Sequence, residues 1–286
     1  MIKIKITLNN KEEDINLLND YLFSKLFSEK GSEKETIYLI NTFTGKNFKT
    51  LSYEPNELKG FHKGNKKSVT DVLVEVDNNT LVNIESQIES QKKFFKRSHF
   101  YNSRLQSLSL EAGEKHEDLP MSIMINILDF NLYDNGNYHK AFIFCDKINK
   151  PYTIEDIEET HYIELPKFRK ELKKGNIDLN NPKDRLMLLL DKKTPQNLIN
   201  KVMKMDKFAN QIYDKAQHIL KDKQEYLTYI RIDQAERDEK ARIRHAKEKG
   251  IKKGKEEIAL KLKKSGSSPE QIAEITELPI KKIKEL

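Results

Sequence analysis

Residues 68–90 read SVTDVLVEVDNNTLVNIESQIES, and this stretch predicts two strands joined by a polar turn at residues 77–80. Successive side chains of a strand point to opposite faces of a sheet. One face of the predicted hairpin is therefore mostly aliphatic, with the members Val72, Val74, Val76, Val82, Ile84, Ser86 and Ile88. The other face carries Asp71, Leu73, Glu75, Leu81, Asn83, Glu85 and Gln87. The pattern thus gathers Asp71, Glu85 and Gln87 on one side of the hairpin.

The acidic side chains on this face conflict with the aliphatic character of the strands. Burying a carboxylate costs free energy unless it is paired or bound to a metal. Two carboxylates about 4 Å apart repel by roughly 4 kcal/mol at an effective dielectric of 20, and a divalent cation would remove that penalty. Oxygen ligands suit Mg²⁺ or Mn²⁺, which could activate a water against a phosphodiester. The hairpin alone leaves a second interpretation open, in which Asp71 and Glu85 lie on an exposed sheet face.

The composition predicts a soluble protein with a lean core. The 286 residues are 37% hydrophobic and 34% charged, and they include a single cysteine, Cys145. One cysteine excludes an internal disulfide and a cysteine-rich zinc site. No apolar run approaches the roughly 18 residues expected of a membrane span, and residues 1–14 lack the apolar region of a secretory signal. We therefore expect a cytoplasmic protein with no membrane partner.

The net charge of +7 is unevenly distributed along the chain. Residues 1–200 hold 30 basic and 30 acidic residues, whereas residues 201–286 hold 22 basic and 15 acidic residues. An excess of positive charge in one region indicates attraction to polyanions such as DNA, although solvated lysine-rich helices give the same sum. The chain has no glycine-rich phosphate loop of the nucleotide-hydrolase type, so no nucleotide cofactor is expected.

The order of apolar patterns predicts an α/β domain over residues 1–195. The nearly continuous apolar run at residues 121–130 suits a buried central strand. The remaining patterns predict helices over residues 12–28, 34–45 and 91–111, and strands over residues 49–58, 138–145 and 161–165.

Residues 196–286 are expected to be almost wholly helical. We predict a charged helical connector over residues 196–257, because residues 235–257 hold too few apolar side chains to bury a core. Residues 258–286 predict a small helix-turn-helix-like tail. In this tail Ser268 is expected to cap a helix that begins at Pro269.

Five segments, in the same order along the chain, resemble the PD-(D/E)XK nuclease family of transposases, which includes the Rpn recombination-promoting nucleases. The central segment is Asp71, thirteen intervening residues and then Glu85-Ser86-Gln87, which is similar to the core motif of the PD-(D/E)XK superfamily. The other segments are NDYLFSKLFSEKG (19–31), FFKRSHFYNSRL (94–105), SIMINILDFNLY (122–133) with HYIELPKF (161–168), and the ending from residue 254. The resemblance implies a restriction-endonuclease-like α/β core, with a mixed sheet flanked by helices, plus an all-helical C-terminal extension.

The same resemblance implies a metal-dependent DNA endonuclease that hydrolyses phosphodiester bonds with Mg²⁺ (or Mn²⁺) in DNA recombination or transposition. It assigns Asp71 and Glu85 as metal ligands and places Gln87 where the superfamily usually has a lysine. Asp20 is a candidate further metal ligand, and its alternative role is to cap the helix that carries Tyr21 to Phe27. Glutamine can orient a water but cannot act as a base. A catalytically decayed DNA-binding or protein-interaction module on the same fold therefore stays open as an alternative.

Four further residues are candidate DNA contacts. Arg97 and Tyr101 are spaced i, i+4 on the helix after the motif, where Arg97 could bind a phosphate and Tyr101 could orient a ligand. A role at the edge of the core fits both residues equally well. Lys92 and Lys93 could supply the missing cation, with ordinary solvated side chains as the alternative. A homodimer through the C-terminal helices would suit cleavage of both DNA strands.

Overall fold

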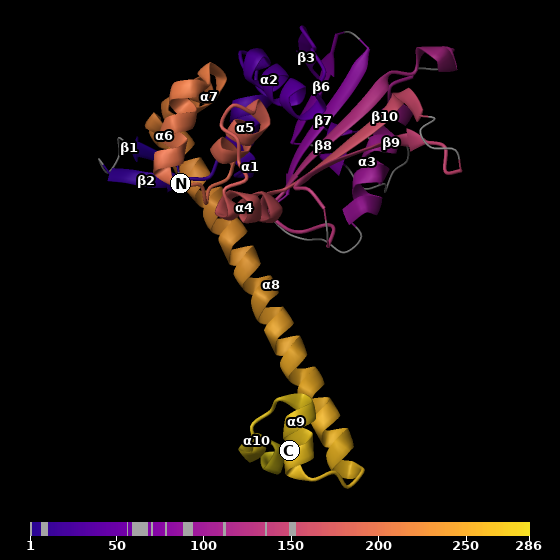
Figure 1. The fold of residues 1–286 in the computed structure, drawn as a ribbon, viewed down its shortest axis with the longest axis vertical. Coiled ribbons are helices and arrows are strands. Elements are labelled where there is room, and N and C mark those ends of the chain that lie inside the picture. Colours follow the sequence, from indigo (N-terminus) through magenta and orange to yellow (C-terminus); the bar gives the residue numbers. More distant parts are fainter. Residues whose placement is uncertain are drawn as a thin grey trace. The chain divides into compact units, whose positions relative to one another are not determined.

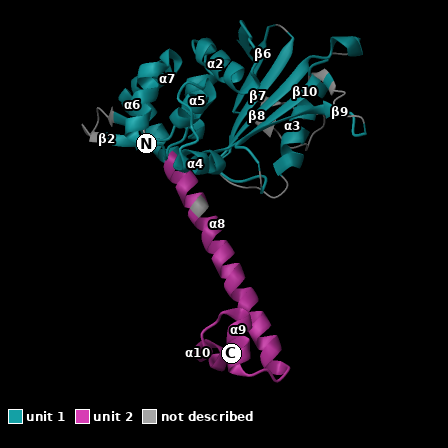
Figure 2. Ribbon diagram, in the orientation of Figure 1, with its two compact units in different colours: residues 1–232 teal, residues 233–286 magenta. Residues whose placement is uncertain are grey.

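A computed structural model gives the fold of the chain. It describes residues 2–6, 11–55, 57–58, 68–69, 71–77, 79–87, 94–110, 113–134, 136–148 and 153–286. The chain forms two compact units, residues 1–232 and residues 233–286 (Figures 1 and 2). The candidate site residues predicted from the sequence all fall in the first unit.

A mixed six-stranded sheet lies at the centre of the first unit, with the strand order β3-β6-β7-β8-β10-β9 (Figure 1). Strands β7, β8 and β10 run parallel to one another, whereas the β3–β6, β6–β7 and β10–β9 pairs are antiparallel. The bounds are β3 (Leu51–Tyr53), β6 (Val72–Val76), β7 (Thr80–Gln87), β8 (Met121–Leu128), β9 (His139–Cys145) and β10 (Thr153–Glu164). A separate short pair joins β4 (Glu57–Leu58) to β5 (Ser68–Val69).

The register of β6 against β7 confirms the two faces predicted for the hairpin. Val72 pairs with Ile84 and Val74 pairs with Val82, and all four side chains are fully buried. Residues directly opposite each other in an antiparallel pair share a face of the sheet. The alternate positions, among them Glu85, therefore lie together on the opposite face.

Helices cover both faces of the sheet. One hydrophobic cluster joins the aliphatic face to α1 (Asp20–Phe27), α2 (Glu33–Thr44), α4 (Leu165–Lys174), α5 (Pro182–Leu190), α6 (Gln196–Met205) and α7 (Lys207–Lys221). On the other face α3 (Phe94–Leu108) packs against β8, and a short 3-10 turn, η1 (His116–Asp118), follows it. This mixed sheet between helices confirms the predicted α/β fold class.

The helix predicted over residues 12–28 is wrong in its first part. Lys11–Ile15 forms strand β2, which pairs with β1 (Ile2–Ile6), and α1 begins only at Asp20. Ile15 also fits a helical spacing with Leu18, but pairing with β1 buries Ile15 on the strand period. Tertiary pairing therefore decides the conformation of this segment.

The first unit also extends beyond the predicted boundary at residue 195. Helices α6 and α7 lie in this unit rather than in a connector, since Ile199, Val202 and Ile212 are fully buried in the main core. These residues form an apolar stripe along otherwise polar helices, and a stripe of that kind is enough to pack one face of a helix against a core. The predicted strand at 161–165 likewise begins earlier, at Thr153.

The second unit contains most of the long helix α8 (Lys223–Lys264), followed by α9 (Pro269–Thr276) and α10 (Ile280–Glu285). A small core forms around the side chains of Ala259, Ile272, Leu278 and Ile283. Ser268 caps α9 as predicted, because its Oγ accepts from the backbone N–H of Gln271 while the Gln271 side chain accepts from the backbone N–H of Ser268. Within the ranges that the structure describes, we find no helix with the length and apolarity needed to cross a membrane.

Candidate active site

Asp71 and Glu85 lie at one edge of the sheet, where β6 begins and β7 ends. Asp71 immediately precedes β6, and its Oδ2 accepts a hydrogen bond of 2.7 Å from the backbone N–H of Ser86. Glu85 is the neighbour of Ser86 in β7 and is only 3% exposed. The interpretation that placed Glu85 on an exposed sheet face is therefore wrong.

A third carboxyl group comes from the start of α1. Ser86 Oγ donates a hydrogen bond of 3.2 Å to the carbonyl oxygen of Leu18, which ties β7 to the segment preceding that helix. Asp20 is the first residue of α1, and the side chain of Asn19 caps the helix instead. The capping role considered for Asp20 is therefore wrong. Its negative charge raises the pKa of both Asp71 and Glu85, so the three carboxyl groups lie within electrostatic reach of one another.

Burial raises the pKa of all three carboxyl groups. Loss of hydration, together with the charge of Asp71, raises the pKa of Glu85 to about 8. Loss of hydration also raises the pKa of Asp71 to about 7, although the hydrogen bond from Ser86 opposes this shift. The pKa of Asp20 is raised by burial as well. Holding like charges close together away from water costs free energy. Groups with strongly perturbed pKa values are concentrated at functional sites.

Two amide side chains hold the carboxylate of Glu85. Gln87 Nε2 donates to Glu85 Oε2 at 3.2 Å, and Asn83 Nδ2 donates to Glu85 Oε1 at 3.4 Å. All three side chains share a face because they stand two residues apart along β7. The sequence singled out Gln87 but missed the contact made by Asn83, although the alternation of the strand already placed it on this face.

Arg97 brings positive charge to the carboxyl pair from α3. Its guanidinium lowers the pKa of Asp71 and of Glu85, in opposition to burial. Arg97 Nε donates to the hydroxyl of Tyr101 at 3.2 Å, and the guanidinium carbon lies 5.2 Å from the centre of the Tyr101 ring. This combination of a hydrogen bond and a cation–π contact orients the arginine. Lys92 and Lys93, the other candidate DNA contacts, lie outside the described residues.

The donor set fits a hard divalent cation held by few protein ligands. Among the described residues, no group of three or more His, Cys, Asp and Glu side chains is arranged to hold a metal ion. Mg²⁺, however, is usually bound through one or two protein carboxylates and completes its shell with water and substrate phosphates. Asp71 and Glu85 offer ligands of that kind. The nearby Asp129, whose backbone N–H donates to the Gln87 carbonyl, is engaged by Arg169 Nη1 at 2.5 Å.

A histidine pair that the sequence did not predict lies elsewhere in the sheet, with His161 buried and His139 half-buried. His139 Nε2 and His161 Nδ1 are 2.9 Å apart, and His161 Nε2 lies 2.9 Å from Glu159 Oε1. Lys46 Nζ completes the chain at 3.2 Å from Glu159 Oε2. Burial, with Lys183 adding to it, lowers the pKa of His139 to about 3. No spacing rule connects two histidines 22 residues apart, because only the pairing of β9 with β10 brings them together.

Replacing His139 by Gln is expected to weaken the acid sensitivity of the fold. The pKa of His139 is about 3 in the folded chain and about 6.5 when unfolded, so both states are neutral above pH 6.5. As the pH falls from 6.5 towards 3, His139 takes up a proton in the unfolded state but not in the folded state. The free energy of unfolding therefore decreases by about 1.4 kcal/mol per pH unit. Urea unfolding at pH 7, 5.5 and 4.5 measures this slope, with the exposed His218→Gln as the control. Identical slopes for His139→Gln and wild type would contradict the prediction.

The sheet order and the flanking helices define an α/β protein with a mixed sheet, and a pair of carboxyl groups lies where β6 begins and β7 ends. The chain belongs to the family described as PD-(D/E)XK nuclease family transposase, whose model matches residues 17–246. The match covers the whole six-stranded sheet and reaches into α8. A search of curated proteins and a search of solved structures each returned no match. The family predicted from the sequence is thus confirmed.

Proposed function

We propose that this protein is a metal-dependent DNA endonuclease that hydrolyses phosphodiester bonds in DNA recombination or transposition. The observation that carries the proposal is the pair Asp71 and Glu85. Loss of hydration raises the pKa of both groups, the charge of Asp71 adds to the shift of Glu85, and the charge of Asp20 adds to both. Membership of a nuclease family supports the reaction class. Burying like charges without a bound cation destabilises the fold, and a cation bound at a nuclease site would offset that cost.

Each residue of the site has a proposed role. Bound Mg²⁺ or Mn²⁺ would polarise the phosphodiester and lower the pKa of a water molecule. Asp71 and Glu85 would bind the ion, with Asp20 as a further carboxyl group. Gln87 would hold Glu85 and orient a water or a phosphate oxygen through its amide. Arg97, oriented by Tyr101, would bind a DNA phosphate, for which a guanidinium is well suited.

Relaxation of a supercoiled plasmid tests this proposal. We expect the purified chain to produce nicked or linear DNA with Mg²⁺ or Mn²⁺ and to produce neither with EDTA. Cleavage that persists in EDTA would contradict the metal dependence. No cleavage with either ion over a range of ion and protein concentrations would contradict the endonuclease activity itself.

Gln87→Ala is expected to slow plasmid nicking about 10- to 100-fold, because residues that orient a metal ligand usually contribute that much. The substitution removes the hydrogen bond to Glu85 Oε2 and leaves both carboxylates in place. Nicking rates under saturating Mn²⁺ measure the effect, and Gln224→Ala, at an exposed position of α8, serves as the control. A wild-type rate for Gln87→Ala would remove Gln87 from the site.

A catalytically decayed DNA-binding module is the second candidate. It is favoured by the glutamine at position 87 and by the lack of a three-residue metal-binding group among the residues that the structure describes. This candidate predicts DNA binding that weakens steeply with salt, but no metal binding and no cleavage. The plasmid assay and a calorimetric titration of Mn²⁺ separate the two candidates.

A homodimer through the C-terminal helices also belongs to the proposal, because two sites would cut two strands. Ile243, Ile251 and Ile258 are 48%, 52% and 49% exposed on α8, and their spacing of eight and seven residues is close to a heptad repeat. We expect Ile243→Glu combined with Ile251→Glu to convert a dimer into monomers in sedimentation velocity. A monomeric wild type at micromolar concentration would contradict the dimer.

A further inference from the structure

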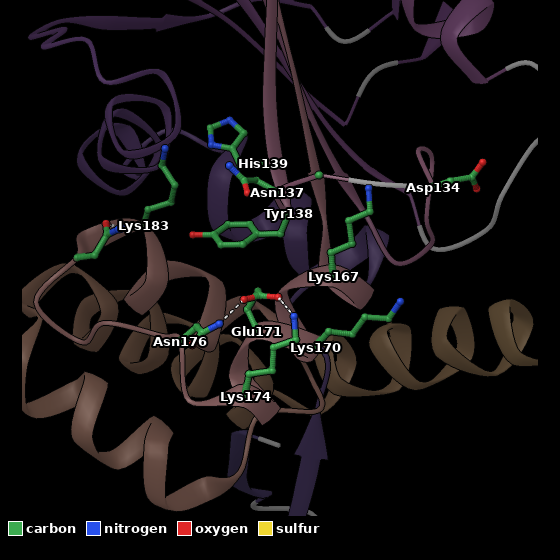
Figure 3. A pocket seen from close by; sticks show the side chains of 12 residues that line it. Asp134, Asn137, Tyr138, His139, Lys167, Lys170, Glu171, Lys174, Asn176 and Lys183 are labelled. Carbon is green, nitrogen blue, oxygen red and sulfur yellow. Dashed lines mark hydrogen bonds and ion pairs between the residues drawn. The ribbon is translucent and has the colours of Figure 1, made fainter.

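Strand β9 forms an edge of the central sheet, because β10 is its one neighbour in the strand order of the described residues. Its first residue, His139, lines a cavity of about 570 Å³ together with residues of α4 and α5 (Figure 3). From Ala141 to Cys145, by contrast, every residue is exposed. An exposed sheet edge presents a row of N–H and C=O groups that can pair with another strand.

The exposed part of β9 is apolar on both faces of the sheet. Residues 141–145 read AFIFC, and Phe142, Ile143 and Phe144 are 43%, 43% and 47% exposed. Their side chains alternate between the two faces. Soluble proteins usually protect an edge strand with charged residues, a proline or a bulge, and residues 141–145 contain neither a charge nor a proline. This composition indicates an edge that pairs with another strand.

The charges on either side of the apolar run make β9 complementary to itself. Lys140 precedes the run and Asp146 follows it, each three residues from Ile143. When two β9 strands pair antiparallel about Ile143, Lys140 of each copy lies opposite Asp146 of the other. In the same register Phe142 lies opposite Phe144. Opposite charges and aromatic pairs at directly opposed positions stabilise a sheet.

The environment of Lys140 favours an acidic neighbour. Its ammonium group lies 4.5 Å from the centre of the Tyr133 ring. Burial, together with the positive charge of Lys167, lowers the pKa of Lys140. A carboxylate brought to this position by a second copy would offset the repulsion between the two lysines.

The backbone of β9 fits the same register. The carbonyl oxygen of Tyr138 accepts a hydrogen bond of 2.7 Å from the backbone N–H of Glu164 in β10. Backbone groups of successive residues point to alternate sides of a strand. Those of Phe142 therefore also point towards β10, whereas those of Ile143 point outwards from the sheet. Ile143 of each copy can thus exchange two N–H···O=C hydrogen bonds with Ile143 of the other.

We propose that β9 pairs antiparallel with β9 of a second copy of this chain, in the register that places Ile143 opposite Ile143. The central sheet then continues across a two-fold axis into the sheet of the second copy. This axis is perpendicular to the sheet, so each face continues as the same face in the other copy. Asp71 and Glu85 of both copies therefore lie on one face of the joined sheet.

The β9 contact is independent of the homodimer proposed through the C-terminal helices. A single pair of short strands is small beside the roughly 1,200 Å² or more that stable interfaces bury. We therefore expect the β9 contact to be weak between free chains and to form more readily between chains that the helices hold at high effective concentration. Disulfide cross-linking captures a weak contact and is the appropriate test.

Cysteines on β9 test the register, since the Cα atoms of a hydrogen-bonded antiparallel pair are about 5.5 Å apart, which suits a disulfide. Cys145 is the only cysteine of the chain, and in this register it lies opposite Ala141 of the other copy. With oxidised glutathione, Ala141→Cys should form a covalent dimer, and so should Ile143→Cys/Cys145→Ser. Wild type and Ala141→Cys/Cys145→Ser should form none, because their identical cysteines are offset by four residues, or roughly 14 Å. Non-reducing gels over a range of protein concentrations measure the dimer.

Further changes in the Ala141→Cys chain show whether strand pairing brings the cysteines together. Ile143→Lys puts a charge at the centre of the edge and should slow cross-linking about tenfold or more. Ile148→Lys is the matched control, at an 87% exposed position beyond the strand, and should cross-link at the unaltered rate. Lys140→Asp should slow cross-linking about tenfold, and Lys140→Asp/Asp146→Lys should restore it, because the exchange recovers the opposed charges. Thermal melting checks that each variant folds.

The outcomes decide both the contact and its register. No covalent dimer from either Ala141→Cys or Ile143→Cys/Cys145→Ser would overturn the contact. Cross-linking of wild type through Cys145 as fast as that of Ala141→Cys would overturn the register, and so would equal rates for Ile143→Lys and Ile148→Lys. None of these measurements uses metal or DNA, so they give an answer even if the chain does not cut DNA.

Discussion

Replacing Asp71 by Asn or Glu85 by Gln is expected to lower the rate of metal-dependent DNA nicking on the order of 10³-fold, at the upper end of the loss seen when one stabilising contact is removed from a reaction centre. Each change keeps the shape of the side chain and removes one of the two carboxylates proposed to hold the ion. The fold should survive both changes, since the neutral amide no longer opposes burial as a carboxylate does. Single-turnover nicking rates with Mg²⁺ and with Mn²⁺ measure the effect.

Glu75→Gln is the matched control for these two variants. Glu75 is on β6 and shares a face with Asp71 and Glu85, but it stands four residues from Asp71, towards the turn. The Glu75→Gln variant should therefore nick DNA at the wild-type rate. If Asp71→Asn and Glu85→Gln both stay within tenfold of this control, the carboxyl pair is not the reaction centre.

Glu85→Gln is also expected to stabilise the metal-free chain at pH 7.5. The pKa of Glu85 is about 8 in the folded chain against 4.5 ordinarily, so between these values the folded state keeps a proton that the unfolded state has released. The stability contributed by this proton is complete below pH 4.5 and is lost as the pH rises towards 8. The loss amounts to about 3 kcal/mol between pH 5.5 and pH 7.5. A glutamine side chain does not titrate, so the Glu85→Gln variant lacks this dependence of stability on pH.

Urea unfolding in EDTA at pH 5.5 and pH 7.5 measures this difference. Wild type should lose more stability between the two pH values than Glu85→Gln, while Glu75→Gln should follow wild type. Adding Mn²⁺ at pH 7.5 should restore the stability of wild type, because a ligand that binds only the folded state stabilises it. Parallel pH dependence in wild type and Glu85→Gln would show that burial does not perturb this carboxyl group.

The hairpin at the centre of the site could be predicted from the sequence because its information is local. Alternation along β6 and β7 fixes which side chains share a face, and the register of Val72 with Ile84 follows that alternation. The acidic spacing from Asp71 to Glu85 then identified the family. The cap at Ser268 was equally predictable, since a side chain and a backbone three residues apart make the contact.

The features that the sequence missed depend on contacts between distant segments. Asn19 and Asp20 are adjacent, and only the position of α1 beside β7, tied by Ser86 and Leu18, shows which one caps and which one approaches the site. The prediction joined residues 196–232 to the charged stretch at 235–257, but α6 and α7 bury an apolar stripe in the main core.

Calorimetric titration of Mn²⁺ into the metal-free chain tests the central claim most directly, because it asks whether the carboxyl groups of Asp71 and Glu85 bind a divalent cation. We predict binding by wild type and by Glu75→Gln, with protons released as the ion displaces them from Asp71 and Glu85. The double variant Asp71→Asn/Glu85→Gln should not bind the ion. Equal Mn²⁺ binding by the double variant and wild type, or no binding by either, would contradict the account.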